Sequence, residues 1–125
     1  MLELVFVYGT LRRGEVNHHL LGGATFLGQH LTLPGYRMLH LGAYPGVVEG
    51  GRVSIVGEIY RVDRQQFVQL DRLEAYPTLF TRKLIPSPWG RAWIYLFRGR
   101  REGRAVIPSG NWLGQTKQSG PFSLY

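Results

Sequence analysis

A short turn near the amino terminus carries residue types that can bind a small anionic molecule. An apolar run ends there in the stretch Tyr8-Gly9-Thr10-Leu11, which two arginines follow. Glycine lets the backbone approach another group closely, and N–H groups exposed at such a turn can donate hydrogen bonds to a carboxylate. The alternative is a turn that only ends a strand, a role for which glycine and threonine are well suited.

A single carboxyl group in the middle of the chain is a candidate for proton transfer. Glu74 follows a predicted helix and precedes Ala75-Tyr76-Pro77. The negative end of the helix dipole and the apolar neighbours Leu73 and Phe80 would both disfavour its charged form and raise its pKa. A carboxyl group with a pKa near neutrality suits general acid–base catalysis. An exposed glutamate at a frayed helix end is the other interpretation that these residues leave open.

The predicted helix that precedes Glu74 spans residues 63–73. Asp63 and Gln66 have the spacing of a capping box. Phe67, Leu70 and Leu73 recur at helical spacing and predict one apolar face, which packs on a sheet.

Short apolar stretches separated by glycine and proline predict a chain made mostly of strands. The continuous run at residues 4–8 predicts a strand that is buried on both faces. Other strands are predicted at residues 25–33, 36–41, 47–48, 54–62, 80–85 and 91–97, and residues 17–21 form one helical turn or a loop. One main helix against about six strands predicts an α+β domain, built on a strongly curled sheet or a small β-barrel. We expect a single domain over residues 1–125, with an irregular tail from about residue 110.

Composition excludes some classes of function. The chain of 125 residues has no cysteine, which excludes disulfides and thiol nucleophiles. No apolar run is long enough to span a bilayer, and no charged segment followed by an apolar one marks a signal peptide. We therefore expect a soluble, cytoplasmic protein without membrane partners.

The net charge of +7 is compatible with binding to nucleic acid. However, the arginines cluster only at residues 98–104, where a solvated hairpin tip is expected. The adjacent His18 and His19 lack an acidic partner at helical spacing, and no metal site is predicted.

Three stretches of the sequence together resemble the gamma-glutamylcyclotransferase-like family. They are "VFVYGTLRRG", "GEIYRVD" and "LDRLEAYPTLFTRKLI", and the resemblance covers residues 4 to about 97. It is strongest to the short bacterial members and to the gamma-glutamylamine cyclotransferase branch. The resemblance implies a small mixed β-barrel flanked by helices.

The resemblance also implies a reaction and the residues that serve it. Family members cyclise a γ-glutamyl amide to 5-oxoproline and release the amine, which needs no metal or cofactor. The loop Tyr8, Gly9, Thr10 and Leu11 then binds the γ-glutamyl group of a small-molecule substrate, and Glu74 transfers protons. Two further positions match the family and are candidate substrate contacts: Tyr95 and Arg82. For Arg82, a role in the fold is the alternative.

Departures from the family pattern keep two other functions open. Phe80 occupies a position where relatives often carry tyrosine, and Tyr60, Tyr76 or Tyr95 are candidate substitutes for that hydroxyl group. A binding protein for γ-glutamyl or related amino-acid groups, without turnover, is therefore the main alternative. A basic nucleic-acid-binding domain is the third class, and specific nucleic-acid binding is not expected. Arg12 and Arg13 either steer an anionic substrate or face water.

Overall fold

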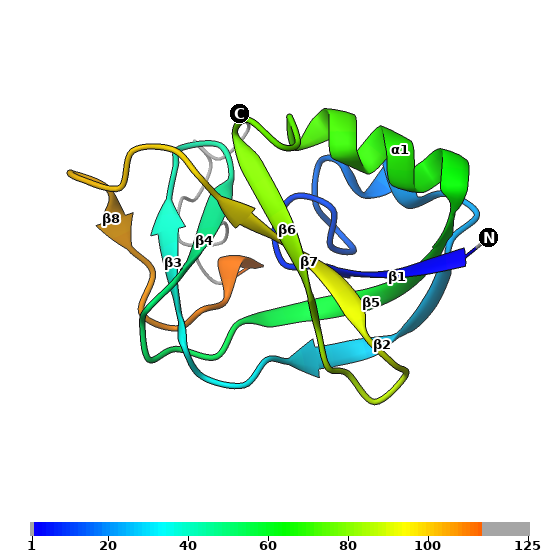
Figure 1. Cartoon of the computed structure of the whole chain (residues 1–125), viewed down its shortest axis with the longest axis horizontal. Coiled ribbons are helices and arrows are strands. Elements are labelled where there is room, and N and C mark those ends of the chain that lie inside the picture. Colours follow the sequence, from blue (N-terminus) through cyan, green and yellow to red (C-terminus); the bar gives the residue numbers. More distant parts are fainter. Residues whose placement is uncertain (1, 114–125) are drawn as a thin grey trace.

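The structure, a computed structural model, describes residues 2–113 and has two sheets and one α-helix in its named elements (Figure 1). The elements in chain order are β1 (Leu2–Val7), the 3₁₀ helix η1 (His18–Leu21), β2 (Thr25–Leu31), β3 (Tyr36–His40), β4 (Pro45–Glu49), β5 (Val56–Asp63), α1 (Arg64–Leu73), β6 (Phe80–Ile85), β7 (Ala92–Phe97) and β8 (Ala105–Val106). The α+β class is confirmed, and the predicted strands and helix match these elements to within two residues at most ends. The predicted tail lies largely outside the described residues.

β1 is the central strand of a mixed five-stranded sheet with the order β2-β5-β1-β7-β6. It pairs antiparallel with β5 and parallel with β7. The sheet has free edges at β2 and β6, and β3, β4 and β8 form a separate sheet. The strand pairing therefore does not close into the β-barrel that was one of the sequence-based expectations.

Both faces of the five-stranded sheet are covered, which explains the continuous apolar run of β1. Val5 and Val7 point to the face under α1, where they pack with Leu70. Phe6 points to the opposite face and packs with residues of the second sheet, such as Met38. Successive strand residues face opposite sides, so a strand between two layers needs apolar residues at every position. The prediction that this strand is buried on both faces is confirmed.

The capping box predicted from the sequence starts α1. The Asp63 carboxylate accepts a hydrogen bond from the Gln66 backbone N–H at 2.7 Å, and the Gln66 side chain accepts one from the Asp63 N–H at 3.0 Å. Leu70 is fully buried against the sheet, whereas Leu73 is 40% exposed at the helix end. Within residues 2–113, no helix is long and apolar enough to cross a membrane.

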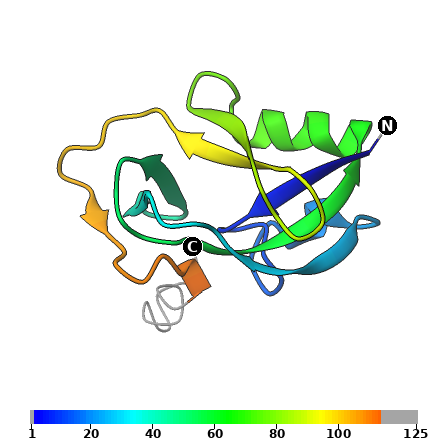
Figure 2. The same ribbon diagram turned by 60° about the horizontal axis from the view of Figure 1, so that its bottom comes forward.

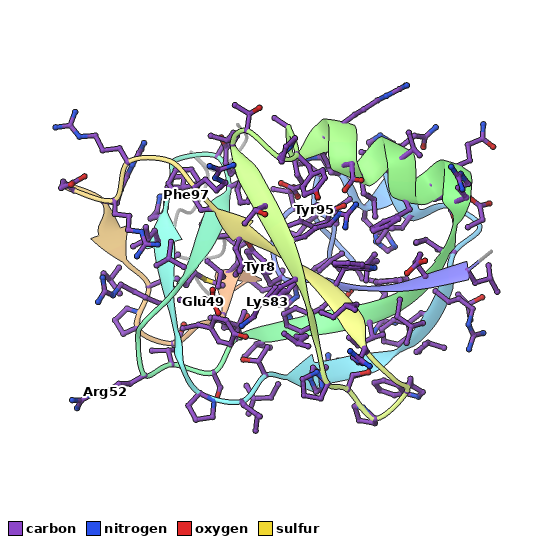
Figure 3. All side chains as sticks on the ribbon, in the orientation of Figure 1. Tyr8, Glu49, Arg52, Lys83, Tyr95 and Phe97 are labelled. Carbon is purple, nitrogen blue, oxygen red and sulfur yellow. The ribbon has the colours of Figure 1, made fainter. Side chains whose placement is uncertain are left out.

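The smaller sheet has the order β4-β3-β8 and lies beside the larger one (Figure 1). An ion pair between Lys83 on β6 and Glu49 on β4 links the two sheets at the surface (Figure 3). β8 pairs with β3, so the arginine-rich segment 98–104 crosses from one sheet to the other. It is solvated as expected, but the hairpin prediction was wrong because β8 does not pair with β7.

Candidate functional site

A cavity of about 260 Å³ lies where the loop after β1 meets the end of α1. Residues from β1, the following loop, the turn into β4, the end of α1, the segment after it, β6 and β7 line it. These residues are Phe6, Val7, Tyr8, Gly9, Thr10, Leu11, Asn17, Tyr44, Pro45, Leu73, Glu74, Leu79, Phe80 and Tyr95. The structure therefore brings Glu74 and Tyr95 to one cavity with the 8–11 loop, from which both are separated by more than 60 residues in the sequence.

Hydrogen bonds hold the 8–11 loop at its two ends. The Tyr8 hydroxyl donates to the Tyr95 carbonyl oxygen at 2.8 Å and accepts from the Val47 N–H at 3.3 Å. Burial raises the pKa of Tyr8 well above its ordinary value, so this hydroxyl stays a donor. At the other end the Thr10 hydroxyl oxygen accepts from the Asn17 side-chain amide at 3.0 Å. The side chains of Tyr8 and Thr10 thus fix the shape of the loop.

The backbone of the loop is available for binding a ligand. Among residues 2–113, no hydrogen-bond acceptor is found for the N–H groups of Gly9, Thr10 and Leu11. Gly9 is required for a reason that the sequence did not reveal. An added Cβ atom at this position would lie 2.8 Å from Cδ of Pro45, which is closer than real Cβ contacts. The close approach is therefore to the proline that begins β4.

Glu74 caps the carboxyl end of α1 and lines the same cavity as the 8–11 loop. Its backbone N–H donates to the Leu70 carbonyl oxygen at 3.0 Å, and Ala75 then turns the chain away with a φ of 49°. Within the described part of the chain, no hydrogen bond or ion pair reaches the Glu74 carboxylate. Removal from water raises the pKa of Glu74 from 4.5 to about 7. The carboxyl group can therefore accept or donate a proton near neutral pH.

Tyr95 lines the cavity from β7, beneath α1 (Figure 3). Its hydroxyl donates to Oδ1 of Asp71 at 2.7 Å. Burial raises the pKa of Tyr95 far above its ordinary value, and the charges of Asp71 and Glu74 raise it further. Tyr95 is therefore a neutral phenol whose proton points at Asp71.

Arg82 is placed outside the cavity. Its Nε and Nη2 atoms donate to the two carboxylate oxygens of Asp71 at 2.9 and 3.1 Å. Its guanidinium carbon lies between 4.2 and 4.6 Å from the ring centroids of Phe67, Tyr76 and Trp93. Arg82 is thus held by an ion pair and by aromatic rings. It pairs with Tyr95 across β6 and β7 and shares Asp71 with it, but it does not line the cavity.

The aromatic wall of the cavity contains a tyrosine that the sequence analysis missed. Phe80 lines the cavity, and Tyr44 stands beside it with a ring-centroid distance of 6.3 Å. Of the candidate substitutes for the hydroxyl that Phe80 lacks, only Tyr95 lines this cavity. Tyr60 and Tyr76 do not. Tyr44 was interpreted as part of a plain turn, and the position of that turn relative to β6 is set only by the tertiary structure.

The prediction that Arg12 steers a substrate or faces water was wrong. Arg12 is 2% exposed and its Nε lies 3.7 Å from Oε2 of Glu58, which is equally buried. Its Nη1 donates to the Asn111 side chain at 2.9 Å. Arg13 is exposed, in agreement with the expectation that it faces water. Its guanidinium carbon lies 4.2 Å from the ring centroid of Phe26, and its backbone N–H donates to Glu58 at 3.0 Å. These residues anchor the chain just after the 8–11 loop and do not line the cavity.

The two adjacent histidines form hydrogen bonds with the backbone. The Nδ1 atoms of His18 and His19 hydrogen-bond to the carbonyl oxygens of Leu11 and Val16. Among the residues from 2 to 113, no group of three or more histidine, aspartate or glutamate side chains is arranged to hold a metal ion.

The fold agrees with comparisons to known proteins. The sequence model of the family "Gamma-glutamyl cyclotransferase, AIG2-like" matches residues 5–114. The chain belongs to this family. A relative from Vibrio cholerae is 48% identical over 112 residues, which are 90% of this chain and 96% of the relative. The gamma-glutamylcyclotransferase family protein YtfP of Escherichia coli K12 is 37% identical over 113 residues, covering 90% and 98% of the two chains.

Solved structures show the same fold. An uncharacterized protein from Pyrococcus horikoshii superposes with a TM-score of 0.80 at 28% identity, covering 93% of this chain and 94% of the other. The solution structure of Escherichia coli ytfP gives a TM-score of 0.74 at 37% identity, covering 90% and 97%. Membership of the family and its α+β fold are thereby established.

Proposed function

We propose that the protein cyclises a γ-glutamyl amide to 5-oxoproline and releases the amine, with Glu74 as the proton-transfer residue. The observation that carries the proposal is the position of Glu74. It lines the same cavity of about 260 Å³ as the 8–11 loop, and its pKa is about 7. Such a group is half ionised at neutral pH, so it can act first as a base and then as an acid.

The reaction proceeds within one substrate molecule. Glu74 takes a proton from the α-ammonium group, and the freed nitrogen attacks the side-chain carbonyl carbon to form the lactam C–N bond. The proton held by Glu74 passes to the departing nitrogen as the original amide C–N bond breaks. The attacking nitrogen then loses a second proton, which Glu74 takes up and passes to the released amine, so that the products are a neutral lactam nitrogen and an alkylammonium ion. Atoms and charge balance without a second reactant. Because nucleophile and electrophile are already joined, the protein has mainly to hold the reactive conformer, and correct orientation can lower the barrier by several kcal/mol.

The 8–11 loop is proposed to hold the glutamyl end of the substrate. The N–H groups of Gly9, Thr10 and Leu11, which line the cavity and have no acceptor among the described residues, are suited to the α-carboxylate. The apolar wall that includes Leu79 and Phe80 then borders the rest of the substrate.

A binding protein without turnover is the second candidate. Phe80 is the observation that favours it, because this cavity residue lacks the hydroxyl group that tyrosine would bring. In that case the same loop would hold a γ-glutamyl group and Glu74 would only contact its ammonium group.

The deciding experiment measures 5-oxoproline release from a panel of γ-glutamyl dipeptides and γ-glutamylamines. We expect turnover by the wild type and a loss of about 10²- to 10⁴-fold in Glu74→Gln, which keeps the shape but removes the titrating group. The wild-type kcat/KM should increase with pH up to about pH 7 and then level off, because Glu74 must be ionised to act as the base.

A matched control is Glu102→Gln, which removes a carboxylate that is 81% exposed on the segment between β7 and β8. It should retain wild-type activity. Binding of γ-glutamyl compounds without any 5-oxoproline would favour the second candidate. Full activity in Glu74→Gln would refute the assigned role of Glu74.

A further inference from the structure

Asp71 receives three hydrogen bonds at the floor of the site, although it does not line the cavity itself. Its Oδ1 accepts from Tyr95 at 2.7 Å and from Nε of Arg82 at 2.9 Å, and its Oδ2 accepts from Nη2 of Arg82 at 3.1 Å. An aspartate paired with a guanidinium is a carboxylate, which has no proton to donate. The hydrogen bond to Tyr95 therefore has one direction: Tyr95 donates and Asp71 accepts.

The contacts of Arg82 hold the Asp71 carboxylate in place as a hydrogen-bond acceptor for Tyr95. The bidentate ion pair fixes the plane of the carboxylate. Three aromatic rings surround the guanidinium, those of Phe67 on α1, Trp93 on β7 and Tyr76 after the helix. The cluster thus ties α1 to the sheet one helical turn before Glu74.

The direction of this hydrogen bond decides what Tyr95 can offer to a ligand. A phenol has one proton and two lone pairs. With its proton committed to Asp71, the Tyr95 oxygen can only accept a hydrogen bond from a molecule in the cavity. Glu74 lines the same cavity and its charge acts on Tyr95, so this pair contributes two acceptors and no donor when Glu74 is ionised. Two such acceptors suit a cationic N–H donor.

We propose that Asp71, held by Arg82, is a positioning residue that makes Tyr95 a hydrogen-bond acceptor, so that Tyr95 and Glu74 together form the subsite for the α-ammonium group of the substrate. This inference rests on the proposed function, because it names the part of the γ-glutamyl group that these residues contact. It gives Arg82 an indirect role in place of the direct substrate contact expected from the sequence.

The test compares two ligands that differ only in the α-amino group. One is the best γ-glutamyl amide of the panel, and the other is the glutaric acid monoamide of the same amine, which cannot cyclise and acts as an inhibitor. In Tyr95→Phe and in Asp71→Asn, KM for the first ligand should rise about tenfold and Ki for the second should stay within twofold. A merely structural role of Asp71 would change both constants together.

The double variant provides an independent criterion. If Asp71 acts through Tyr95, Asp71→Asn should raise KM no further when Tyr95 is already phenylalanine. Asp63→Asn is the matched control, because it removes a carboxylate at the far end of the same helix while asparagine still caps the helix. It should leave both constants unchanged. Equal changes in KM and Ki, an unchanged KM in Tyr95→Phe, or additive effects in the double variant would each overturn the inference.

The proposed ammonium subsite can be tested separately from the proposed reaction. If the wild type releases no 5-oxoproline, the proposed function fails, and calorimetry with L-glutamine and glutaramic acid still tests the subsite. The quantity to compare is the Kd for glutaramic acid divided by the Kd for L-glutamine. This ratio should be about tenfold higher in the wild type than in Tyr95→Phe. The same ratio in both proteins, or no binding of either compound, would refute the subsite as well.

Discussion

Glu74 shows how its position in the fold sets the chemistry of a single carboxyl group. It shares a helix end with Asp71, three residues earlier. Asp71 is neutralised by Arg82 and stays a hydrogen-bond acceptor, whereas Glu74 has no cationic partner among residues 2–113 and is kept from water. Two carboxyl groups one turn apart are thus suited to different tasks, one to holding Tyr95 and the other to moving protons.

The raised pKa of Glu74 makes the stability of the protein depend on pH. The folded pKa of about 7 lies above the ordinary 4.5, so the stability contributed by the protonated form is fully present below pH 4.5 and is lost as the pH rises through 7. Glu74→Gln removes this dependence. Relative to the wild type, the variant should therefore gain up to about 3 kcal/mol in unfolding free energy between pH 4 and pH 8.

Urea unfolding of both proteins at the two pH values measures this difference. Glu102→Gln, which changes an exposed carboxylate, should show no such gain. A difference between Glu74→Gln and the wild type that is the same at pH 4 and pH 8 would contradict the assigned pKa.

At the level of elements, the close packing of β1 on β5 positions the 8–11 loop. Gly57 on β5 leaves no room for a side chain, because an added Cβ atom would lie 2.5 Å from the Val7 carbonyl oxygen and 2.6 Å from Cζ of Phe6. Both contacts belong to the last residues of β1, immediately before Tyr8. The glycine in β5 therefore sets where the loop begins.

The substitution Gly57→Ala should cost about 3 kcal/mol of unfolding free energy, because the carbonyl group of a central strand cannot move away cheaply. Gly103→Ala is the control. Gly103 has open space around it and a φ of 77°, so alanine there meets only backbone strain of about 1 kcal/mol. Thermal and urea unfolding measure both values, and equal costs at the two positions would show that crowding at Gly57 is unimportant.

At the level of the whole molecule, the two edges of the larger sheet are linked by a side chain. Trp89 lies in the loop between β6 and β7, and Figure 2 shows this loop passing over β5 toward β2. Its ring reaches Gly28 of β2, where an added Cβ atom would lie 2.6 Å from Cη2. β6 and β2 are the opposite edges of the sheet. The edges thus meet through an indole ring and not through a backbone ladder.

Loss of this link should weaken the fold without changing the site. Because Trp89 is 40% exposed, Trp89→Ala should cost about 1–2 kcal/mol of unfolding free energy. The kinetic constants for 5-oxoproline release should stay at the wild-type values, since Trp89 does not line the cavity. Leu33→Ala, at a position that is 71% exposed, should cost less than about 0.5 kcal/mol. Equal stability of Trp89→Ala and the wild type would show that the link is dispensable.

The sequence by itself determined the local structure and the principal candidates. Capping and periodicity located α1, and the continuous apolar run located β1 and its burial, because both depend on neighbours along the chain. The motif residues of the 8–11 loop and Glu74 were found through their resemblance to a known family. The cytoplasmic location, the absence of specific nucleic-acid binding and the roles of the site residues stay predictions.

Only the tertiary structure decided which of these residues face one another. It turned Arg82 away from the cavity onto Asp71, buried Arg12 on Glu58, and placed Tyr44 beside Phe80. It also paired β8 with β3 and left the larger sheet open. Each of these outcomes depends on contacts between residues that are far apart in the chain. Local spacing carries no information about such contacts, because many folds satisfy the same pattern of apolar residues and turns.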